Sequence, residues 1–168
     1  MMKKKNGEHP SGDIGQVILL VVFIIVWVGD SFIYHKSTFL SVYVPLFVRL
    51  ALFMIVETCA IALIRAGHVV VHDVEAPPHI ITSGAFKLVR HPLYLGCILF
   101  YAGLVLSTLS LLSLIALGGI FIFYNYIASY EEEFLEEQFH EEYSTYREKT
   151  PKWIPRIEQS RHDLSFLS

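Results

Sequence analysis

The longest stretch of this chain without a charged residue runs from His91 to Tyr130 and reads HPLYLGCILFYAGLVLSTLSLLSLIALGGIFIFYNYIASY. A membrane-spanning helix needs about 20 apolar residues, so these 40 residues are enough for two such helices. Ser-Thr-Leu-Ser at 107–110 interrupts the apolar run and predicts a turn there. We therefore expect a helical hairpin over residues 92–128, with a rather short first helix at Leu93–Leu106 and a second at Leu109–Ile127.

The composition of the whole chain supports a membrane protein. Of its 168 residues, 54% are hydrophobic and 17% are charged, whereas a soluble domain has roughly 25% charged residues. This composition excludes a disordered chain, a collagen-like chain and a disulfide scaffold, and it disfavours a water-soluble globule. The net charge of −3 leaves no basic face for nucleic acid, so the expected partner is the lipid bilayer.

Two apolar stretches upstream of the hairpin, Ile14–Tyr34 and Phe39–Ile64, predict two more spans. They carry Asp30, Arg49 and Glu57, and charges inside a membrane are costly unless they are paired or lie in a polar cavity. Asp30 either has a functional role or lies near an interface and pairs with Arg49 across two helices, and the sequence leaves both interpretations open. Glu57 has no obvious partner.

The distribution of basic residues predicts the orientation of the four spans. Eleven of the 13 basic residues fall on one side; Lys36 falls on the other, and Arg49 lies within a span. Because basic residues accumulate on the cytoplasmic side, both termini are expected there. The first span is expected to be a retained anchor, because no small-x-small cleavage site follows it.

The acidic segment after the last span, Tyr130–Lys149, predicts an amphipathic helix. Its apolar positions 135, 139, 143 and 146 fall on one helix face, and Pro151 and Pro155 end the pattern. We expect this helix to lie against the protein or to continue the fourth span. The expected fold is thus an all-α integral membrane protein with about four transmembrane helices, the hairpin over 92–128 and a cytoplasmic C-terminal amphipathic helix.

Polar residues gather where the hairpin begins and where it ends. Arg90, His91 and Tyr94 precede or open its first helix, and Glu131 and Glu132 follow its second helix. Because a hairpin returns to the side on which it starts, these groups are expected to meet at one membrane boundary. They form either a ligand pocket or a structural salt bridge from Arg90 to one of the two glutamates. The sequence leaves both alternatives open.

A glycine and several histidines are open to more than one interpretation. Gly96 allows the close approach of a ligand or of another backbone. His68 and His72 are four residues apart, with Asp73 and His79 nearby, but no further ligand has the fixed spacing of a structural zinc site. We therefore expect no metal, and we expect these histidines at an interface or in a polar pocket.

Two motifs of this chain resemble the signature of the isoprenylcysteine carboxyl methyltransferase family, which is related to the phospholipid methyltransferases. The first is Thr82-Ser83-Gly84-x5-Arg90-His91-Pro92-x-Tyr94-x-Gly96, and the second is Glu131-Glu132-x2-Leu135-x3-Phe139-x-Glu141-Glu142-Tyr143-x2-Tyr146. The resemblance covers roughly residues 79–155. It implies a membrane-embedded methyltransferase that uses S-adenosylmethionine and a lipophilic methyl acceptor.

The resemblance also implies roles for individual residues. Those implied to bind the cofactor are His79, Ile80, Ile81, Phe86, His91, Pro92, Tyr94, Gly96 and Glu131. Those implied to take part in catalysis are Arg90, His91 and Glu132.

Three positions depart from the family pattern. Phe86 replaces a frequent tyrosine, and His140 replaces a frequent glycine. Tyr126 stands where the prenylcysteine enzymes have an arginine thought to hold the substrate carboxylate. The acceptor is therefore expected to be lipophilic, but it need not be a prenylcysteine.

The chain is expected to divide into a two-span anchor at 1–66, a cofactor-binding region at 67–156 and a polar tail at 157–168. Two other functions remain open from the sequence. One is an NADPH-dependent membrane reductase, and the other is a non-catalytic membrane protein that kept the fold.

Overall fold

The computed structural model describes residues 12–72 and 80–155, and all regular structure in these residues is helical. The long helices are α1 (Gly12–Val28), α2 (Leu46–His72), α3 (Pro92–Thr108) and α4 (Leu111–Lys149). Short helices lie between them: the π-helix η1 (Gly29–Tyr34) and the 3-10 helices η2 (Phe39–Val42) and η3 (Gly84–Lys87). The all-α fold class is confirmed.

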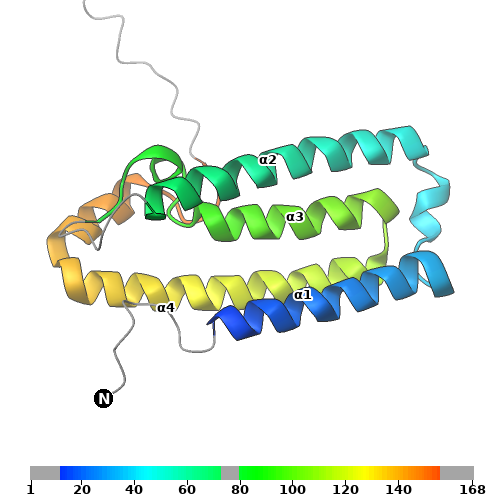
Figure 1. The fold of residues 1–168 in the computed structure, drawn as a ribbon, viewed down its shortest axis with the longest axis horizontal. Coiled ribbons are helices and arrows are strands. Elements are labelled where there is room, and N and C mark those ends of the chain that lie inside the picture. The colour runs from blue at the N-terminus through cyan, green and yellow to red at the C-terminus, as the bar shows by residue number, and fades with distance from the viewer. Residues whose placement is uncertain (1–11, 73–79, 156–168) are drawn as a thin grey trace, which may run out of the picture.

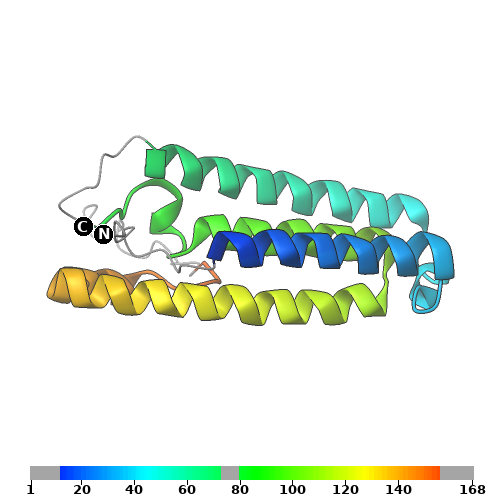
Figure 2. The same ribbon diagram turned by 60° about the horizontal axis from the view of Figure 1, so that its bottom comes forward.

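The four long helices run up and down in alternation, and α3 lies between α2 and α4 (Figures 1 and 2). The helix α1 packs against α4. Because successive helices are antiparallel, the start of α3 and the later part of α4 lie at the same end of the bundle.

Three of the described helices are long and apolar enough to cross a membrane: Ile14–Tyr34, Leu46–His68 and Leu111–Lys149. The helix α3 has 17 residues, which at 1.5 Å per residue gives about 25 Å against a hydrocarbon core of about 30 Å. The protein is therefore a helical membrane protein, and a fourth complete span stays a prediction.

The turn of the hairpin lies within the predicted stretch 107–110. Leu109 adopts a left-handed conformation with φ 53°, and its N–H donates to Val105 O at 2.7 Å, which ends α3. The next residue, Ser110, accepts a hydrogen bond from Ser113 N at 3.1 Å and begins α4.

The contact between α2 and α3 depends on glycines. A Cβ atom on Gly96 would lie 2.6 Å from Ile64 Cγ1 and 3.0 Å from Ala60 O. A Cβ atom on Gly103 would lie 2.3 Å from Oε1 of Glu57. Small residues of this kind let two helix backbones approach closely in a membrane. The close approach that Gly96 allows is therefore that of α2.

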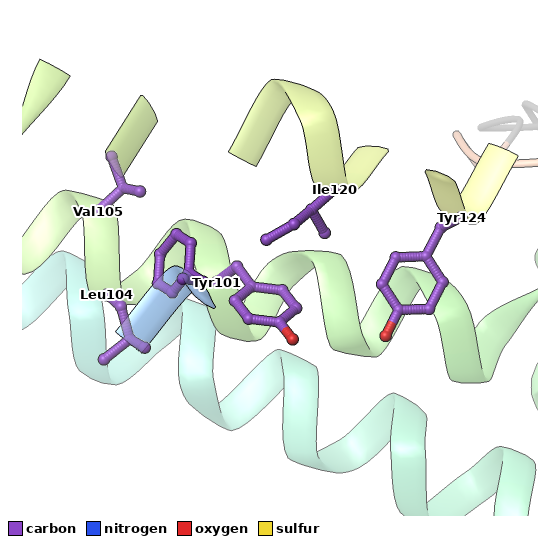
Figure 3. Packing of buried hydrophobic residues seen from close by; sticks show 6 residues of the cluster. Tyr101, Leu104, Val105, Ile120 and Tyr124 are labelled. Atoms are coloured by element: carbon purple, nitrogen blue, oxygen red, sulfur yellow. The ribbon is translucent and has the colours of Figure 1, made fainter. Parts of the chain in front are cut away.

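Aromatic and aliphatic side chains of three helices form the core between α3 and α4. Tyr101 and Leu104 of α3 lie in one cluster with Ile120 and Tyr124 of α4 (Figure 3). Val105 of α3 and Phe23 of α1 complete it, and the ring of Phe23 meets Tyr101 edge to face at 4.8 Å. This core fixes α3 against α4 and α1, while the glycines fix it against α2.

The proposed pairing of Asp30 with Arg49 is wrong. The buried carboxylate of Asp30 accepts hydrogen bonds from Ser37 N at 3.0 Å and from the hydroxyls of Ser37 and Ser110. These donors satisfy the hydrogen-bonding capacity of the Asp30 carboxylate at the place where the connection between α1 and α2 meets the start of α4. Arg49 instead donates to backbone carbonyls, and Oε1 of Glu57 is buried without a hydrogen-bond partner in the described part of the chain.

The acidic segment over 130–149 continues the fourth predicted span, which was one of the two predicted alternatives. The resulting helix α4 is not straight. His140 breaks the helix with φ 44° and ψ −115°. Beyond this break the chain turns back along the bundle (Figure 1), and Tyr146 donates from its hydroxyl to Phe86 O at 2.7 Å. Helical periodicity alone cannot show such a break, because the apolar spacing continues through it.

Substitution of Gly96 by alanine is expected to destabilise the protein by about 1–3 kcal/mol, because the new methyl group meets Ile64 and the backbone of Ala60. The matched control is Gly118→Ala in α4, where a Cβ meets nothing within 4 Å. That change is expected to be neutral or to stabilise by up to about 1 kcal/mol through helix propensity. Thermal unfolding in detergent compares the two variants, and equal effects would contradict the close α2–α3 contact.

Substitution of His140 by glycine is expected to stabilise the protein by roughly 1 kcal/mol, because glycine adopts positive φ without steric cost. The control is Glu137→Gly, at an exposed helical position of the same helix, where glycine is expected to cost about 1 kcal/mol. The same unfolding measurement applies. Destabilisation by both substitutions would show that residue 140 is helical.

Candidate functional site

The cluster predicted at the ends of the hairpin is present, and its centre is the carboxylate of Glu132. Oε1 of Glu132 accepts from Arg90 Nε at 2.9 Å and lies 2.9 Å from His91 Nε2. The side chains of Arg90 and Glu132 are each 10% exposed, and that of His91 is 7% exposed. A carboxylate this deeply buried needs ionic and hydrogen-bonding partners, and the two residues that precede α3 supply them.

Arg90 also holds the chain that follows α4. Its Nη1 donates to Arg147 O at 3.1 Å and to Thr150 O at 2.9 Å, and its backbone N–H donates to Pro151 O at 2.9 Å. The structural salt bridge considered from the sequence therefore exists, and it is made to Glu132. Through it, Arg90 joins the start of α3 to the middle and the end of α4.

A second, more accessible layer of the cluster contains Glu131. The hydroxyl of Tyr94 donates to Oε1 of Glu131, and His91 Nδ1 lies 3.8 Å from Oε2. The rings of His91 and Tyr94 are stacked, with centroids 5.7 Å apart. The side chain of Glu131 is 23% exposed, more than twice the fraction for Glu132. Glu131 is thus the acidic group of this cluster that a ligand reaches more easily.

Burial sets the protonation of His91. It lowers the pKa of the imidazole below the ordinary value of 6.5, the charges of Lys152 and Arg90 act in the same direction, and the Glu132 carboxylate acts in the opposite one. The imidazole is therefore neutral near pH 7. The hydrogen bond to Glu132 implies that the neutral imidazole carries its proton on Nε2 and donates it to the carboxylate. In this tautomer, Nδ1 is a hydrogen-bond acceptor.

Four residues that were not predicted from the sequence complete the cluster: Asn125, Ser129, Lys152 and Trp153. Lys152 donates from Nζ to Ser129 Oγ at 2.8 Å and lies 3.8 Å from Oε2 of Glu132. Trp153 donates from its indole to Asn125 Oδ1 at 3.0 Å, and its ring centroid lies 5.9 Å from that of His91. Burial lowers the pKa of Lys152, and Glu132 acts in the opposite direction.

One signal in the sequence pointed to Lys152 and Trp153. A cation and a tryptophan lie between Pro151 and Pro155, directly after an acidic helix. Prolines there end the helix, so the chain is free to turn back over it. No sequence pattern shows, however, that the returning chain meets Asn125 and Ser129.

The segment before the first motif lies beside the tail helix. Ile80 donates from its backbone N–H to Glu142 Oε1 at 3.3 Å, and Phe86 accepts from Tyr146 through its carbonyl. Ile81 and Phe86 are half-buried. His79 lies outside the described residues.

The other residues singled out from the sequence are placed as follows. Pro92 is buried in the first turn of α3. Gly96 faces α2. Among the described residues there is no group of three or more His, Cys, Asp or Glu that could hold a metal ion. Asp73 lies outside those residues.

Comparisons with known proteins agree with the two motifs. A family model described as phospholipid methyltransferase matches residues 50–142. The chain is 32% identical over 103 residues to a probable protein-S-isoprenylcysteine O-methyltransferase of Oryza sativa subsp. indica, covering 58% of this chain and 54% of that protein. It is 27% identical over 101 residues to protein-S-isoprenylcysteine O-methyltransferase B of Arabidopsis thaliana, covering 57% and 51%. The chain spans about half the length of these curated relatives, and no solved structure matches significantly.

The stability of the protein is expected to fall as the pH is lowered below about 6.5. The unfolded chain takes up a proton at the ordinary pKa of His91, whereas the folded protein resists it down to a lower pH. The contribution of neutral His91 to the free energy of unfolding is thus fully present above pH 6.5 and is lost progressively below it. Thermal unfolding from pH 8 to pH 5 measures this loss.

The His91→Gln variant is expected to lose less stability between pH 8 and pH 5 than the unmodified protein. The control is Gly118→Ala in α4, because this substitution changes no titratable group and its Cβ meets nothing within 4 Å. Its pH dependence is expected to match that of the unmodified protein. An unchanged pH dependence in His91→Gln would contradict the assignment.

Proposed function

The chain belongs to the phospholipid methyltransferase family, and from this premise we propose that it is a membrane-embedded methyltransferase that uses S-adenosylmethionine. The names of the relatives agree with the methyltransferase class and with the resemblance found in the two motifs. The observation that carries the proposal is the cluster of Glu131, Tyr94 and His91, which lies inside the matched range at one end of the bundle.

The polar groups of this cluster fit the polar part of such a cofactor. S-adenosylmethionine supplies a methyl group already activated on a sulfonium. Its amino-acid part carries an ammonium, for which the Glu131 carboxylate is a suitable acceptor. The Tyr94 hydroxyl orients that carboxylate, and the neutral His91 ring offers a further acceptor at Nδ1. The cofactor-binding segment is proposed to include Ile80, Ile81, Phe86 and Pro92, together with His79.

Arg90 and Glu132 are proposed to act on the reaction by holding the cluster in place. Arg90 directs Nε and Nη1 to Glu132 and to backbone carbonyls, so it ties the start of α3 to α4. Glu132 in turn holds the His91 ring beside Tyr94. Methyl transfer is an in-line displacement that requires positioning and the exclusion of water, and a rigid, buried support provides both.

The acceptor is proposed to be a lipophilic molecule that arrives from the bilayer. The relatives are named for action on isoprenylcysteine. In this chain Tyr126 stands where the resemblance implies an arginine in the prenylcysteine enzymes, and its side chain is exposed. Near Tyr126 in α4, however, Asn125 O and Ser129 Oγ accept hydrogen bonds from the ammonium of Lys152. This ammonium supports an acceptor that carries a negative charge, such as a carboxylate at the end of a lipid tail.

The binding of S-adenosylhomocysteine to purified protein in detergent tests the proposal. Isothermal calorimetry is expected to show saturable binding, and Glu131→Gln is expected to weaken it at least about tenfold, because a charge-assisted hydrogen bond is lost. Glu133→Gln removes an exposed neighbouring carboxylate and is expected to bind like the unmodified protein. Far-UV circular dichroism verifies that each variant is helical.

Two results would contradict the proposal. A folded, unmodified protein that binds no S-adenosylhomocysteine would favour the reductase or the non-catalytic alternative, and titration with NADPH would distinguish these two. Equal binding by Glu131→Gln and Glu133→Gln would keep the methyltransferase class but place the cofactor elsewhere.

A further inference from the structure

A cavity lies at the end of the bundle opposite to Glu132. It has a volume of about 510 Å³, and residues of α1, α2 and α3 line it, together with the connection between α1 and α2. It reaches Thr108 at the end of α3, whereas the Glu132 cluster lies at Pro92, where α3 begins. The 17 residues of α3 separate the two sites by roughly 25 Å.

Arg49 supplies a positive charge to this cavity. Its Nε donates to Val44 O at 3.2 Å and its Nη1 donates to Ser107 O at 3.0 Å. Within residues 12–72 and 80–155, no carboxylate forms an ion pair with it. Asp30, at the same end of the bundle, is occupied by Ser37 and Ser110. The guanidinium thus enters the cavity with carbonyl partners but without a counter-ion.

The remaining walls of the cavity combine hydroxyl groups with exposed apolar side chains. Thr38 and Ser41 contribute hydroxyls on the side of the connection between α1 and α2. Phe32, Leu46 and Leu50 line the cavity as well. Phe32 and Leu46 are each 58% exposed, and Leu50 is 46% exposed. A cation beside hydroxyls, with an apolar exit toward the bilayer, is complementary to an amphiphile with an anionic head.

We propose that this cavity binds an anionic phospholipid of the leaflet opposite to the Glu132 cluster. Arg49 holds the phosphate, since its planar donors match phosphate oxygens. An acyl chain follows the exposed side chains of Leu46 and Leu50. Lipid phosphates are the abundant anions at the ends of membrane helices, whereas a free phosphate ion would leave the apolar wall unused.

Tryptophan fluorescence provides a direct test, because the chain has two tryptophans and Trp27 lines the cavity. In a Trp153→Phe background, Trp27 is the remaining fluorophore. The protein is reconstituted into vesicles of phosphatidylcholine and phosphatidylglycerol, with bromine on the acyl chains of one lipid at a time to quench the fluorescence. The quenching is expected to show a preference of roughly fivefold for phosphatidylglycerol.

Three variants in this background identify the source of the preference. Arg49→Gln is expected to abolish it, while Lys36→Gln, which removes an exposed charge at the same end, is expected to retain it. Ser41→Phe fills the cavity and leaves Arg49 in place, so it is also expected to abolish the preference, even if Arg49→Gln fails to fold. Helicity measured by circular dichroism verifies the fold of each variant.

Four results would overturn the proposal. These are no preference in the Trp153→Phe protein, an equal loss in Lys36→Gln and Arg49→Gln, an undiminished preference in folded Ser41→Phe, and displacement of the lipid by millimolar inorganic phosphate. An equal loss in the two charge variants would indicate general surface attraction, and displacement by phosphate would indicate a free-anion site. None of these results depends on methyl transfer, so the proposed function is tested separately.

Discussion

The candidate site depends on the hydrogen bonds that the buried carboxylate of Glu132 makes with Arg90 and His91. A charge so far from water is stable only with ionic and hydrogen-bonding partners, and Arg90 and His91 provide them from the residues directly before α3. Arg90 extends this connection to the carbonyls of Arg147 and Thr150 after the break in α4. The pair of Arg90 and Glu132 therefore holds together the start of α3, the middle of α4 and the end of α4, and this support places the accessible groups of the site.

The helix α3 connects this site to the rest of the bundle. Gly96 and Gly103 let it approach α2 closely, and Tyr101 fixes it in the core against α4 and α1. The position of His91 is thus set from both faces of α3 as well as by Glu132. The two ends of the bundle hold charge differently. Glu132 is paired with the cations Arg90 and Lys152, whereas Arg49 has carbonyl partners and no counter-ion among the described residues.

Much of the fold and part of the site could be predicted from the sequence, because they depend on local composition. The absence of charge over 91–130 predicted the helical hairpin, and the polar residues at 107–110 predicted its turn. A hairpin must return to its starting side, which is sufficient to place Arg90 and His91 at the same end of the bundle as Glu131 and Glu132, where the structure pairs them with Glu132. The resemblance to a methyltransferase family came from the same residues and agrees with the family match.

Features that depend on which segments meet in space could not be predicted. Asp30 takes hydroxyl partners rather than Arg49, because the first connection folds over the start of α4. The break at His140 and the return of Lys152 to the site have no periodic signal. The sequence by itself determined the helices, the hairpin and the residues at its ends, since each follows from short-range patterns of apolar and polar residues. Only the tertiary structure decided the partner of each buried charge, because a charge pairs with whichever donor the packing of the helices brings near.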